Sequence, residues 1–177
     1  MKKTVLLFLV LCLAASAFAS SGVLVQAAGA ITELEKSVLA ALWKLPHYGV
    51  FDNITFKVEG STVTLAGQAL IPITKEDATR RVKQLPGVTE VVNNLEVLPL
   101  SDNDDSLRIR AYRVIFSTAD LYRYAMGADP TIHIIVKNGR ITLEGVVSSK
   151  QDADLALLAA RGIPGSLGTA SNLKIQK

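Results

Sequence analysis

The sequence has few of the residues on which catalysis and disulfide bonding depend. Among its 177 residues are one cysteine, Cys12, and two histidines, His47 and His133. A single cysteine cannot form an intramolecular disulfide, and a zinc site needs more ligands at closer spacing than two distant histidines provide. An enzyme also needs several reactive groups that converge, and no such set stands out. We therefore predict no catalytic residues, no metal site and no cofactor.

Long apolar runs are scarce, and the one at the N-terminus covers residues 5–15. Two lysines precede it, and the small residues of an A-x-A cleavage site follow at 17–19. This order is typical of a secretory signal peptide, which we assign to residues 1–19, with a second cleavage point after Ala27. An uncleaved membrane anchor is the alternative, but Ala, Ser and Gly dilute the stretch before it reaches the roughly 20 apolar residues of a spanning helix.

A strong excess of one charge is also missing. Lys and Arg total 19 and Asp and Glu total 16, a net charge of +3, and loss of Lys2 and Lys3 with the signal peptide lowers this to +1. Such a balance lacks the concentrated basic surface of a nucleic-acid-binding protein. Because Cys12 is lost with the same segment, the mature chain must fold on its hydrophobic core without disulfides.

What the sequence does contain is an internal repeat. The stretch ITFKVEGSTVTLAG (54–67) aligns without a gap with IHIIVKNGRITLEG (132–145), at an offset of 78 residues. Shorter matches follow in the same order. They are KEDA (75–78) with KQDA (150–153), Pro86-Gly87 with Pro164-Gly165, and Asn94-Leu95 with Asn172-Leu173. Chance hairpins would not also agree on these downstream residues, so the matches indicate a duplicated module.

Each aligned stretch has the pattern of a β-hairpin. Apolar and polar residues alternate over 54–58 and 132–136, as in half-buried strands, which places His133 on the outward face. Asn138-Gly139 is a strong type I′ turn signal, and Gly60-Ser61 occupies the same place with weaker chemistry. The hairpins should therefore form in both copies.

A helix is predicted on either side of each hairpin. The apolar stripes and helical segments are residues 34–45, 75–85, 107–115 and 150–161. Capping signals precede three of them, at Thr32 with Glu35, Thr74 with Asp77, and Ser149 with Asp152. Pro-Gly then ends the second helix of each copy, and a last strand follows. Its core-facing residues are Val91, Leu95 and Val97 in the first copy and Leu167, Leu173 and Ile175 in the second.

These elements predict an α+β fold. It consists of two α-β-β-α-β modules, each with two helices packed on one face of a three-stranded mixed sheet. The predicted boundaries are residues 32–98 for the first domain, 99–106 for a polar linker and 104–177 for the second domain.

The hairpin pattern V-x-N-G-x-V/I-T-L-x-G, with a Pro-Gly before the last strand, resembles the BON domain. The second copy carries it in Val136, Asn138, Gly139, Ile141, Thr142, Leu143, Gly145, Pro164-Gly165 and Asn172-Leu173. In the first copy Gly60-Ser61 replaces Asn-Gly, while Val63-Thr64-Leu65 and Gly67 are retained. The residues assigned to the fold motif are Gly67, Pro86, Gly87, Asn138, Gly139, Gly145, Pro164 and Gly165. The two glycines that end the hairpin strands mark a bend or a close approach of the backbone.

The resemblance implies an exported bacterial envelope protein, periplasmic or peripheral to the outer membrane, that supports membrane integrity or osmotic stress tolerance. It implies a non-enzymatic module that contacts phospholipid or envelope proteins. The alternative function is a holdase-like chaperone or adaptor that binds partners through its sheet edges.

The segment 107–126 is the main candidate for a binding surface. Its arginines and aromatic residues are Arg108, Arg110, Tyr112, Arg113, Phe116, Tyr122, Arg123 and Tyr124. On one exposed edge, the guanidinium groups could contact the phosphates of an anionic membrane while the rings lie at the interface. The alternative is an ordinary amphipathic helix with its aromatics in the core and its arginines on the wet face.

Other motifs are weaker. The SDNDD stretch (101–105) could attract calcium but lacks the glycine and glutamate of an EF-hand loop, so a solvated linker with a helix N-cap is the preferred interpretation. The GSLG stretch (165–168) has the GXXG spacing of an RNA-binding loop but joins a helix to a strand. We predict no nucleic-acid partner and no small-molecule substrate, and the oligomeric state stays open.

Overall fold

The computed structural model describes residues 32–118, 120–126 and 130–176. The predicted signal peptide and both of its cleavage points lie outside these residues. In the first module the elements are α1 (Glu33–Trp43), β1 (Asn53–Glu59), β2 (Thr62–Ala69), α2 (Pro72–Lys83) and β3 (Glu90–Val97). In the second they are α3 (Asp102–Ser117), the 3-10 helix η1 (Leu121–Tyr124), β4 (Ile132–Lys137), β5 (Arg140–Val147), α4 (Lys150–Arg161), β6 (Gly168–Ser171) and β7 (Lys174–Ile175). No helix among the described residues is long and apolar enough to cross a membrane.

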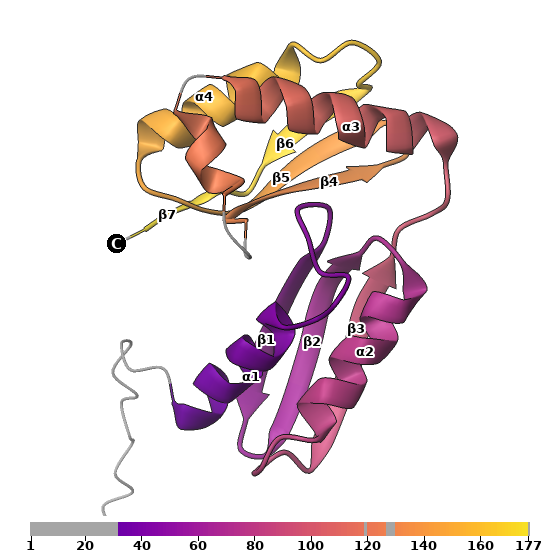
Figure 1. Cartoon of the computed structure of the whole chain (residues 1–177), viewed down its shortest axis with the longest axis vertical. Coiled ribbons are helices and arrows are strands. Elements are labelled where there is room, and N and C mark those ends of the chain that lie inside the picture. The colour runs from indigo at the N-terminus through magenta and orange to yellow at the C-terminus, as the bar shows by residue number, and fades with distance from the viewer. Residues whose placement is uncertain (1–31, 119, 127–129, 177) are drawn as a thin grey trace, which may run out of the picture. The chain divides into compact units, whose positions relative to one another are not determined.

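The α+β fold and its two α-β-β-α-β modules are confirmed. In each module the hairpin strands are antiparallel, and the second strand of the hairpin pairs in parallel with the last strand, which makes each sheet mixed. The two helices of a module cover one face of its sheet (Figure 1). The second sheet has four strands instead of three, because β6 and β7 are two short pieces that both pair with β5.

Each module has its own hydrophobic core between helices and sheet. The first core centres on Val38, Leu42, Val63, Leu65, Ala78, Val82 and Leu95. The second centres on Leu107, Ala111, Ile115, Ile132, Ile134, Val136, Ile141, Leu143, Ala156 and Ala160. Both sets follow the helical and strand periodicities of the sequence, so hydrophobic burial explains why these segments form these elements.

Two of the four α-helices begin where the sequence predicts, and the other two begin at earlier residues. Thr32 and Glu35 form a reciprocal capping box on α1, and the Ser149 side chain accepts a hydrogen bond from the backbone N–H of Asp152 on α4. The predicted cap at Thr74 is wrong, because α2 begins at Pro72, which suits the first helical turn, and buries Thr74 inside the helix. Residues 102–106, assigned to the linker, form the start of α3, capped by Ser101.

The last strand of the second module also departs from the prediction. Leu167 and Ile175 are exposed instead of facing the core, and only Leu173 of the three packs against it. Leu167 lies before β6 begins, outside the strand, and the interruption between β6 and β7 breaks the alternation of inward and outward residues before Ile175. In the first module β3 is continuous, and Leu95 is buried as predicted.

The hairpins contain two kinds of glycine. Asn138 and Gly139 both have positive φ, as the type I′ turn requires. Gly67 and Gly145 have φ of +111° at equivalent points of β2 and β5, and a Cβ there would overlap the carbonyl oxygen of Asn53 or of Thr131 on the paired strand. Close approach of the two backbones is thus the reason for glycine at these positions.

We expect Gly67→Ala and Gly145→Ala each to lower the free energy of unfolding by more than about 3 kcal/mol, because the added methyl group has no space and the backbone is strained. Gly60→Ala is the control. Gly60 also has positive φ, but nothing lies near a Cβ there, so we expect a loss of about 1 kcal/mol. Denaturant unfolding measures all three, and equal losses would contradict the role of close backbone approach.

Candidate functional site

The predicted binding residues of 107–126 divide between the core and the surface. Arg108, Phe116 and Tyr124 are buried, whereas Arg110, Tyr112, Arg113, Tyr122 and Arg123 are exposed. Arg110 reaches toward Gly165, beyond the end of α4, and so lies apart from the aromatic residues. The structure therefore brings together only part of the predicted set.

Arg108 does not belong to the predicted lipid-binding surface, because it is buried. Its side chain is only 3% exposed, and its Nη2 donates a hydrogen bond of 2.8 Å to the carbonyl oxygen of Val136 on β4. Its Nη1 pairs with Asp105, one turn earlier on α3. A buried guanidinium that caps a strand carbonyl cannot contact a membrane.

The outer edge of β4 is capped at two of its backbone groups. Besides the Arg108 bond to Val136, the backbone N–H of Ile134 donates to the carbonyl oxygen of Val50 at 2.7 Å. Val50 belongs to the junction loop, residues 44–52, which follows α1 in the first module. Covered edges do not accept a partner strand, so this edge does not offer the surface that an edge-binding adaptor would use.

His133 is a second correction. The alternation placed it on an outward face, but it is only 7% exposed because the junction loop covers that face of β4. Its Nε2 lies 3.4 Å from the Tyr48 hydroxyl, and the two rings are 5.6 Å apart. Burial lowers the pKa of His133, and backbone groups of Gly49 and Asp52 oppose this shift.

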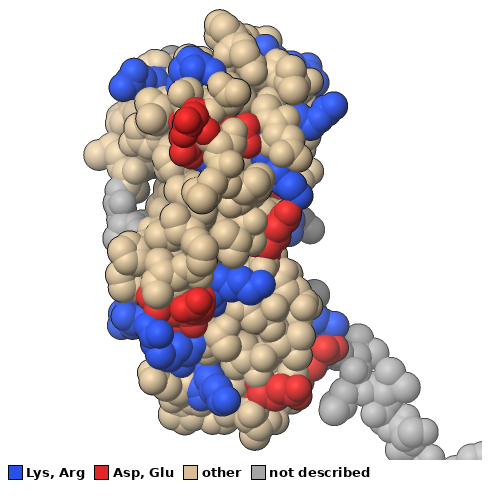
Figure 2. Space-filling view, turned by 90° about the vertical axis from the view of Figure 1, so that its right-hand side faces the viewer, with Lys and Arg blue, Asp and Glu red and all other residues tan. Residues whose placement is uncertain are grey.

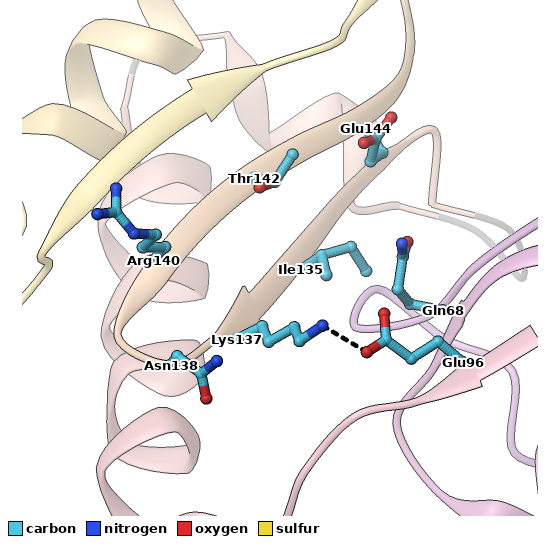
Figure 3. A pocket seen from close by; sticks show the side chains of 8 residues that line it. All are labelled: Gln68, Glu96, Ile135, Lys137, Asn138, Arg140, Thr142 and Glu144. Carbon is cyan, nitrogen blue, oxygen red and sulfur yellow. Dashed lines mark hydrogen bonds and ion pairs between the residues drawn. The ribbon is translucent and has the colours of Figure 1, made fainter.

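A cleft of about 330 Å³ lies on the open face of the second sheet (Figure 3). Its charged lining residues are Glu96, Lys137, Arg140 and Glu144, two of each sign. Lys137 Nζ forms an ion pair of 2.5 Å with Glu96 Oε1. Because the charges balance and one cation is already paired, this cleft does not favour an anionic ligand.

The exposed aromatic residues line a different hollow, which we call the α3–η1 groove. It measures about 370 Å³ and is lined by Tyr112, Arg113, Phe116, Ser117, Tyr122, Ala125 and Met126. Tyr122 and Met126 are 57% and 65% exposed and lie together at this hollow. Arg113 is the only charged residue among these, and it makes no ion pair within the part of the chain that the structure describes.

The face of the molecule shown in Figure 2 carries dispersed charges instead of one basic patch. On the face shown in Figure 2, Lys and Arg occur in small separate groups, often beside Asp or Glu, with wide uncharged areas between them. The result agrees with the small net charge of the sequence. Any contact with anionic groups must then depend on local arrangements of a few cations.

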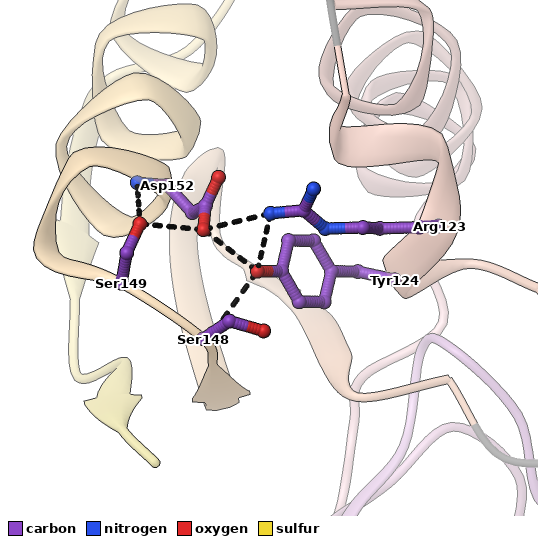
Figure 4. Close-up of polar contacts among 5 residues, drawn as sticks. All are labelled: Arg123, Tyr124, Ser148, Ser149 and Asp152. Carbon is purple, nitrogen blue, oxygen red and sulfur yellow. Dashed lines mark hydrogen bonds and ion pairs between the residues drawn. The ribbon is translucent and has the colours of Figure 1, made fainter. Parts of the chain in front are cut away.

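A polar network holds η1 against the start of α4 (Figure 4). Asp152 Oδ2 accepts hydrogen bonds from Ser149 Oγ at 2.6 Å, the Tyr124 hydroxyl at 2.8 Å and Arg123 Nη2 at 2.9 Å. The Tyr124 hydroxyl in turn accepts from the backbone N–H of Ser148 at 3.0 Å. Hydrogen bonds to the carboxylate, of which the one from Ser149 has the largest effect, lower the pKa of Asp152 and keep the carboxylate charged. The network fixes one wall of the α3–η1 groove.

Asp104 is a further structural residue that the sequence did not identify. It is buried at the start of α3, and its two carboxylate oxygens accept 2.8 Å hydrogen bonds from the backbone N–H groups of Asn138 and Gly139. It therefore ties the helix to the turn of the second hairpin. The signal was the acidic SDNDD stretch, but the sequence alone did not show that one of its acids reaches a turn 34 residues away.

We expect Arg108→Gln to lower the free energy of unfolding by about 1.5–3 kcal/mol, because it removes a charged hydrogen bond and leaves the Val136 carbonyl without that partner. The matched control is Arg110→Gln, which changes an exposed arginine two residues along and should stay within about 0.5 kcal/mol of the unchanged protein. Urea unfolding compares the two variants, and an Arg108 variant as stable as the control would contradict the structural role.

We expect stability to fall as the pH is lowered below about 6.5, the usual pKa of histidine, through protonation at His133. The pKa of His133 is depressed in the folded state, so the unfolded chain takes up the proton first and is favoured as the pH falls toward the folded-state pKa. Burial raises the pKa of the neighbouring Asp52, which acts in the opposite direction at lower pH.

Unfolding midpoints measured from pH 5 to 7.5 test this expectation. His133→Gln should flatten the profile, whereas His47→Gln, in the same loop region but exposed, should keep it. A profile that is flattened by the His47 change and not by the His133 change would overturn the assignment.

Comparison with known proteins gives one family. The BON domain model matches residues 31–99 and 123–177, one match in each module. Helix α3 lies between the two matched regions, outside the part of the second module that the family model matches. No curated protein matches the chain significantly.

Two solved structures of CdsD, a structural protein of the type III secretion system of Chlamydia trachomatis, are similar to this chain. One, of the C-terminal domain, has 14% sequence identity and a TM-score of 0.30, covering 84% of this chain and 100% of that chain. The other has the same identity and TM-score over 82% and 93% of the respective chains. At this TM-score the likeness carries no argument about function. The family matches cover most of the chain, which therefore belongs to the BON-domain family and carries two of its domains in tandem.

Proposed function

We propose that this protein is a non-enzymatic, exported envelope protein that contacts anionic phospholipid membranes through the α3–η1 groove of its second module. The observation that carries the proposal is the set of exposed apolar side chains beside Arg113, which forms no ion pair with any residue that the structure describes. In the periplasm such a contact would support membrane integrity or osmotic stress tolerance.

The chemistry of the groove suits the boundary between lipid headgroups and acyl chains. Tyr112 and Tyr122 have apolar rings with a polar tip, which is the combination favoured at membrane interfaces. Met126 adds a flexible apolar side chain, and the Arg113 guanidinium matches the geometry of a phosphate. The contact is peripheral in this proposal, with side chains entering the headgroup region from outside.

The hollow between the helices of the first module is lined differently. It measures about 400 Å³, and its lining is Ser37, Ala40, Ala41, Lys44, Arg81, Gln84 and Leu85, without an aromatic residue among them. Cations alone give weak contacts that salt screens, whereas apolar side chains add burial. We therefore assign membrane contact to the second module.

The rival function, a chaperone or adaptor that binds at sheet edges, has less support. The edge of β4 is covered by Val50 and Arg108. On β3, Lys75 Nζ donates to the carbonyl oxygen of Leu95 at 2.6 Å, and the Leu95 N–H donates to Asn93 Oδ1. Two of the edges on which strand addition would depend are thus capped.

Vesicle co-sedimentation of residues 20–177 tests the proposal. We expect binding to anionic vesicles that weakens as salt is raised, and little binding to neutral vesicles. Arg113→Gln should lower the affinity about fivefold, since a cation near an anionic surface contributes about 1 kcal/mol. The control is Lys83→Gln, which removes the same charge from the exposed end of α2 in the first module.

The outcomes separate the alternatives. Loss of binding with Arg113→Gln but not with Lys83→Gln places the contact at the groove. Equal losses with both variants would indicate general charge attraction and contradict the assigned site. Absence of binding to any vesicle would retire the membrane proposal and favour a protein partner.

A further inference from the structure

We propose that strand β1 pairs with β1 of a second copy of this chain, so that the three-stranded sheets of two first modules join edge to edge. The surface lies in the first module and is independent of the membrane contact proposed above. In the sheet order β1-β2-β3, the strands β1 and β3 are the two edges. Of these, β1 carries a row of backbone groups that the described part of the chain leaves without hydrogen bonds.

The register of the first hairpin identifies the free groups of β1. Glu59 pairs with Thr62 across the two-residue turn, so these two residues exchange both backbone hydrogen bonds, and bonded pairs then alternate along the hairpin. The N–H and C=O groups of Ile54, Phe56 and Val58 therefore point away from β2. Within the described residues no hydrogen bond reaches them. The outer edge of β1 is thus ready to accept a strand.

The second module shows the same edge in a capped form. The groups of its β4 that correspond to this row by the repeat are those of Ile134 and Val136. Ile134 donates to the carbonyl oxygen of Val50, and Arg108 donates to the carbonyl oxygen of Val136. In α1, Glu35 takes the place of Arg108 directly after the first apolar residue of the helical stripe. Its carboxylate belongs to the capping box of α1 and cannot donate to a strand carbonyl.

The spacing of the free groups selects a second copy as the occupant. They lie symmetrically about Phe56, so an antiparallel copy related by a two-fold axis at this residue places Phe56 opposite itself. Ile54 then lies opposite Val58 of the second copy, and Val58 opposite its Ile54. Each of these pairs exchanges two hydrogen bonds, which satisfies the whole row on both chains.

The side chains of β1 agree with this register. On the open face Thr55 lies opposite Lys57 of the second copy, and Asn53 lies opposite its Glu59, so no like charges meet directly. Lys57 and Glu59 also form an ion pair of 2.7 Å within each chain, which leaves the edge without an excess of charge. On the helix side, the half-buried Phe56 packs against the first core, and pairing covers it further.

The other edge of the first sheet limits the assembly to two copies. On β3 the carbonyl oxygen of Leu95 accepts a 2.6 Å hydrogen bond from Lys75 Nζ, and the Leu95 N–H donates to Asn93 Oδ1. A sheet that is open at one edge and capped at the other pairs once and then stops. The two-fold contact therefore gives a closed dimer instead of a fibre.

Sedimentation equilibrium of residues 20–177 at concentrations up to about 1 mM tests the proposal. We expect a weak monomer–dimer equilibrium, because one strand pair buries less area than a standard interface. Thr55→Lys places like charges opposite Lys57 of the second copy at two symmetric points and should lower the association constant roughly fivefold. Thr55→Glu places opposite charges there and should raise it by a similar factor. Thr55 is exposed, and both variants lose its hydrogen bond to Ala66 alike.

The matched controls are Gln84→Lys and Gln84→Glu, at the exposed end of α2. They make the same changes of net charge away from β1 and should leave the association constant unchanged. Equal effects at residues 55 and 84 would show general charge attraction and overturn the assigned edge.

Disulfide cross-linking measures the register directly, because residues 20–177 contain no cysteine. In the proposed dimer, positions 55 and 57 of opposite chains form a pair without backbone hydrogen bonds, with Cα atoms about 4.5 Å apart, which a disulfide can bridge. Like positions lie about 7–8 Å apart on the diagonal. A mixture of the Thr55→Cys and Lys57→Cys variants should therefore cross-link faster than either variant alone.

Two results would overturn the proposal. One is a monomer at every concentration, which would leave the edge of β1 to a strand of another protein. The other is a dimer in which the mixed cysteine variants cross-link no faster than each variant by itself, which would place the contact between copies elsewhere. A dimer that responds with opposite sign to the two Thr55 changes and cross-links between positions 55 and 57 supports the shared sheet.

Discussion

The hydrogen bond from the Tyr124 hydroxyl to Asp152 is the interaction on which the candidate site depends. It lies where three segments meet, since Tyr124 belongs to η1, Asp152 starts α4 and the same hydroxyl accepts from Ser148 at the end of β5. Together with the Arg123 bond to the same carboxylate, it holds η1 against α4, and Tyr122 and Met126 lie beside α3 as a result. The groove thus depends on a buried, charge-assisted contact between two residues that are not part of its lining.

The backbone N–H at the end of the second hairpin strand has a different hydrogen-bond acceptor in each module. In the first module the N–H of Leu70, at the end of β2, donates to Asp52, whereas the equivalent N–H of Ser148 donates to Tyr124. Asp52 stands at the end of the junction loop, which is free to reach the second module. In the second module the acceptor is Tyr124 of η1. This short helix packs within its own module and forms a groove with α3. A duplicated fold has in this way produced one joining loop and one candidate binding surface.

Local signals in the sequence predicted the fold well. Asn138-Gly139 and the cap at Ser149 depend on backbone geometry within a few residues, and the structure has each as expected. Residues whose environment comes from distant segments could not be predicted. The alternation placed His133 outward correctly for an isolated strand, but the junction loop, 85 residues away in sequence, covers it. Arg108 occupies a helical position that the pattern assigns to a wet face, and only the edge of β4 explains its burial.

Helix α3 shows why residue type alone could not define the site. Arg108 and Arg113 are five residues apart on one helix, and they point to different environments because helical positions five apart lie on different faces. Arg108 donates a hydrogen bond to a carbonyl oxygen at the edge of β4. Arg113 lies beside the α3–η1 groove and forms no ion pair with the described residues. Arg108 therefore takes part in folding, whereas Arg113 is exposed on the surface of α3. Because Arg113 is exposed, its charge can change without loss of the fold, so a surface at this position can vary with the ligand.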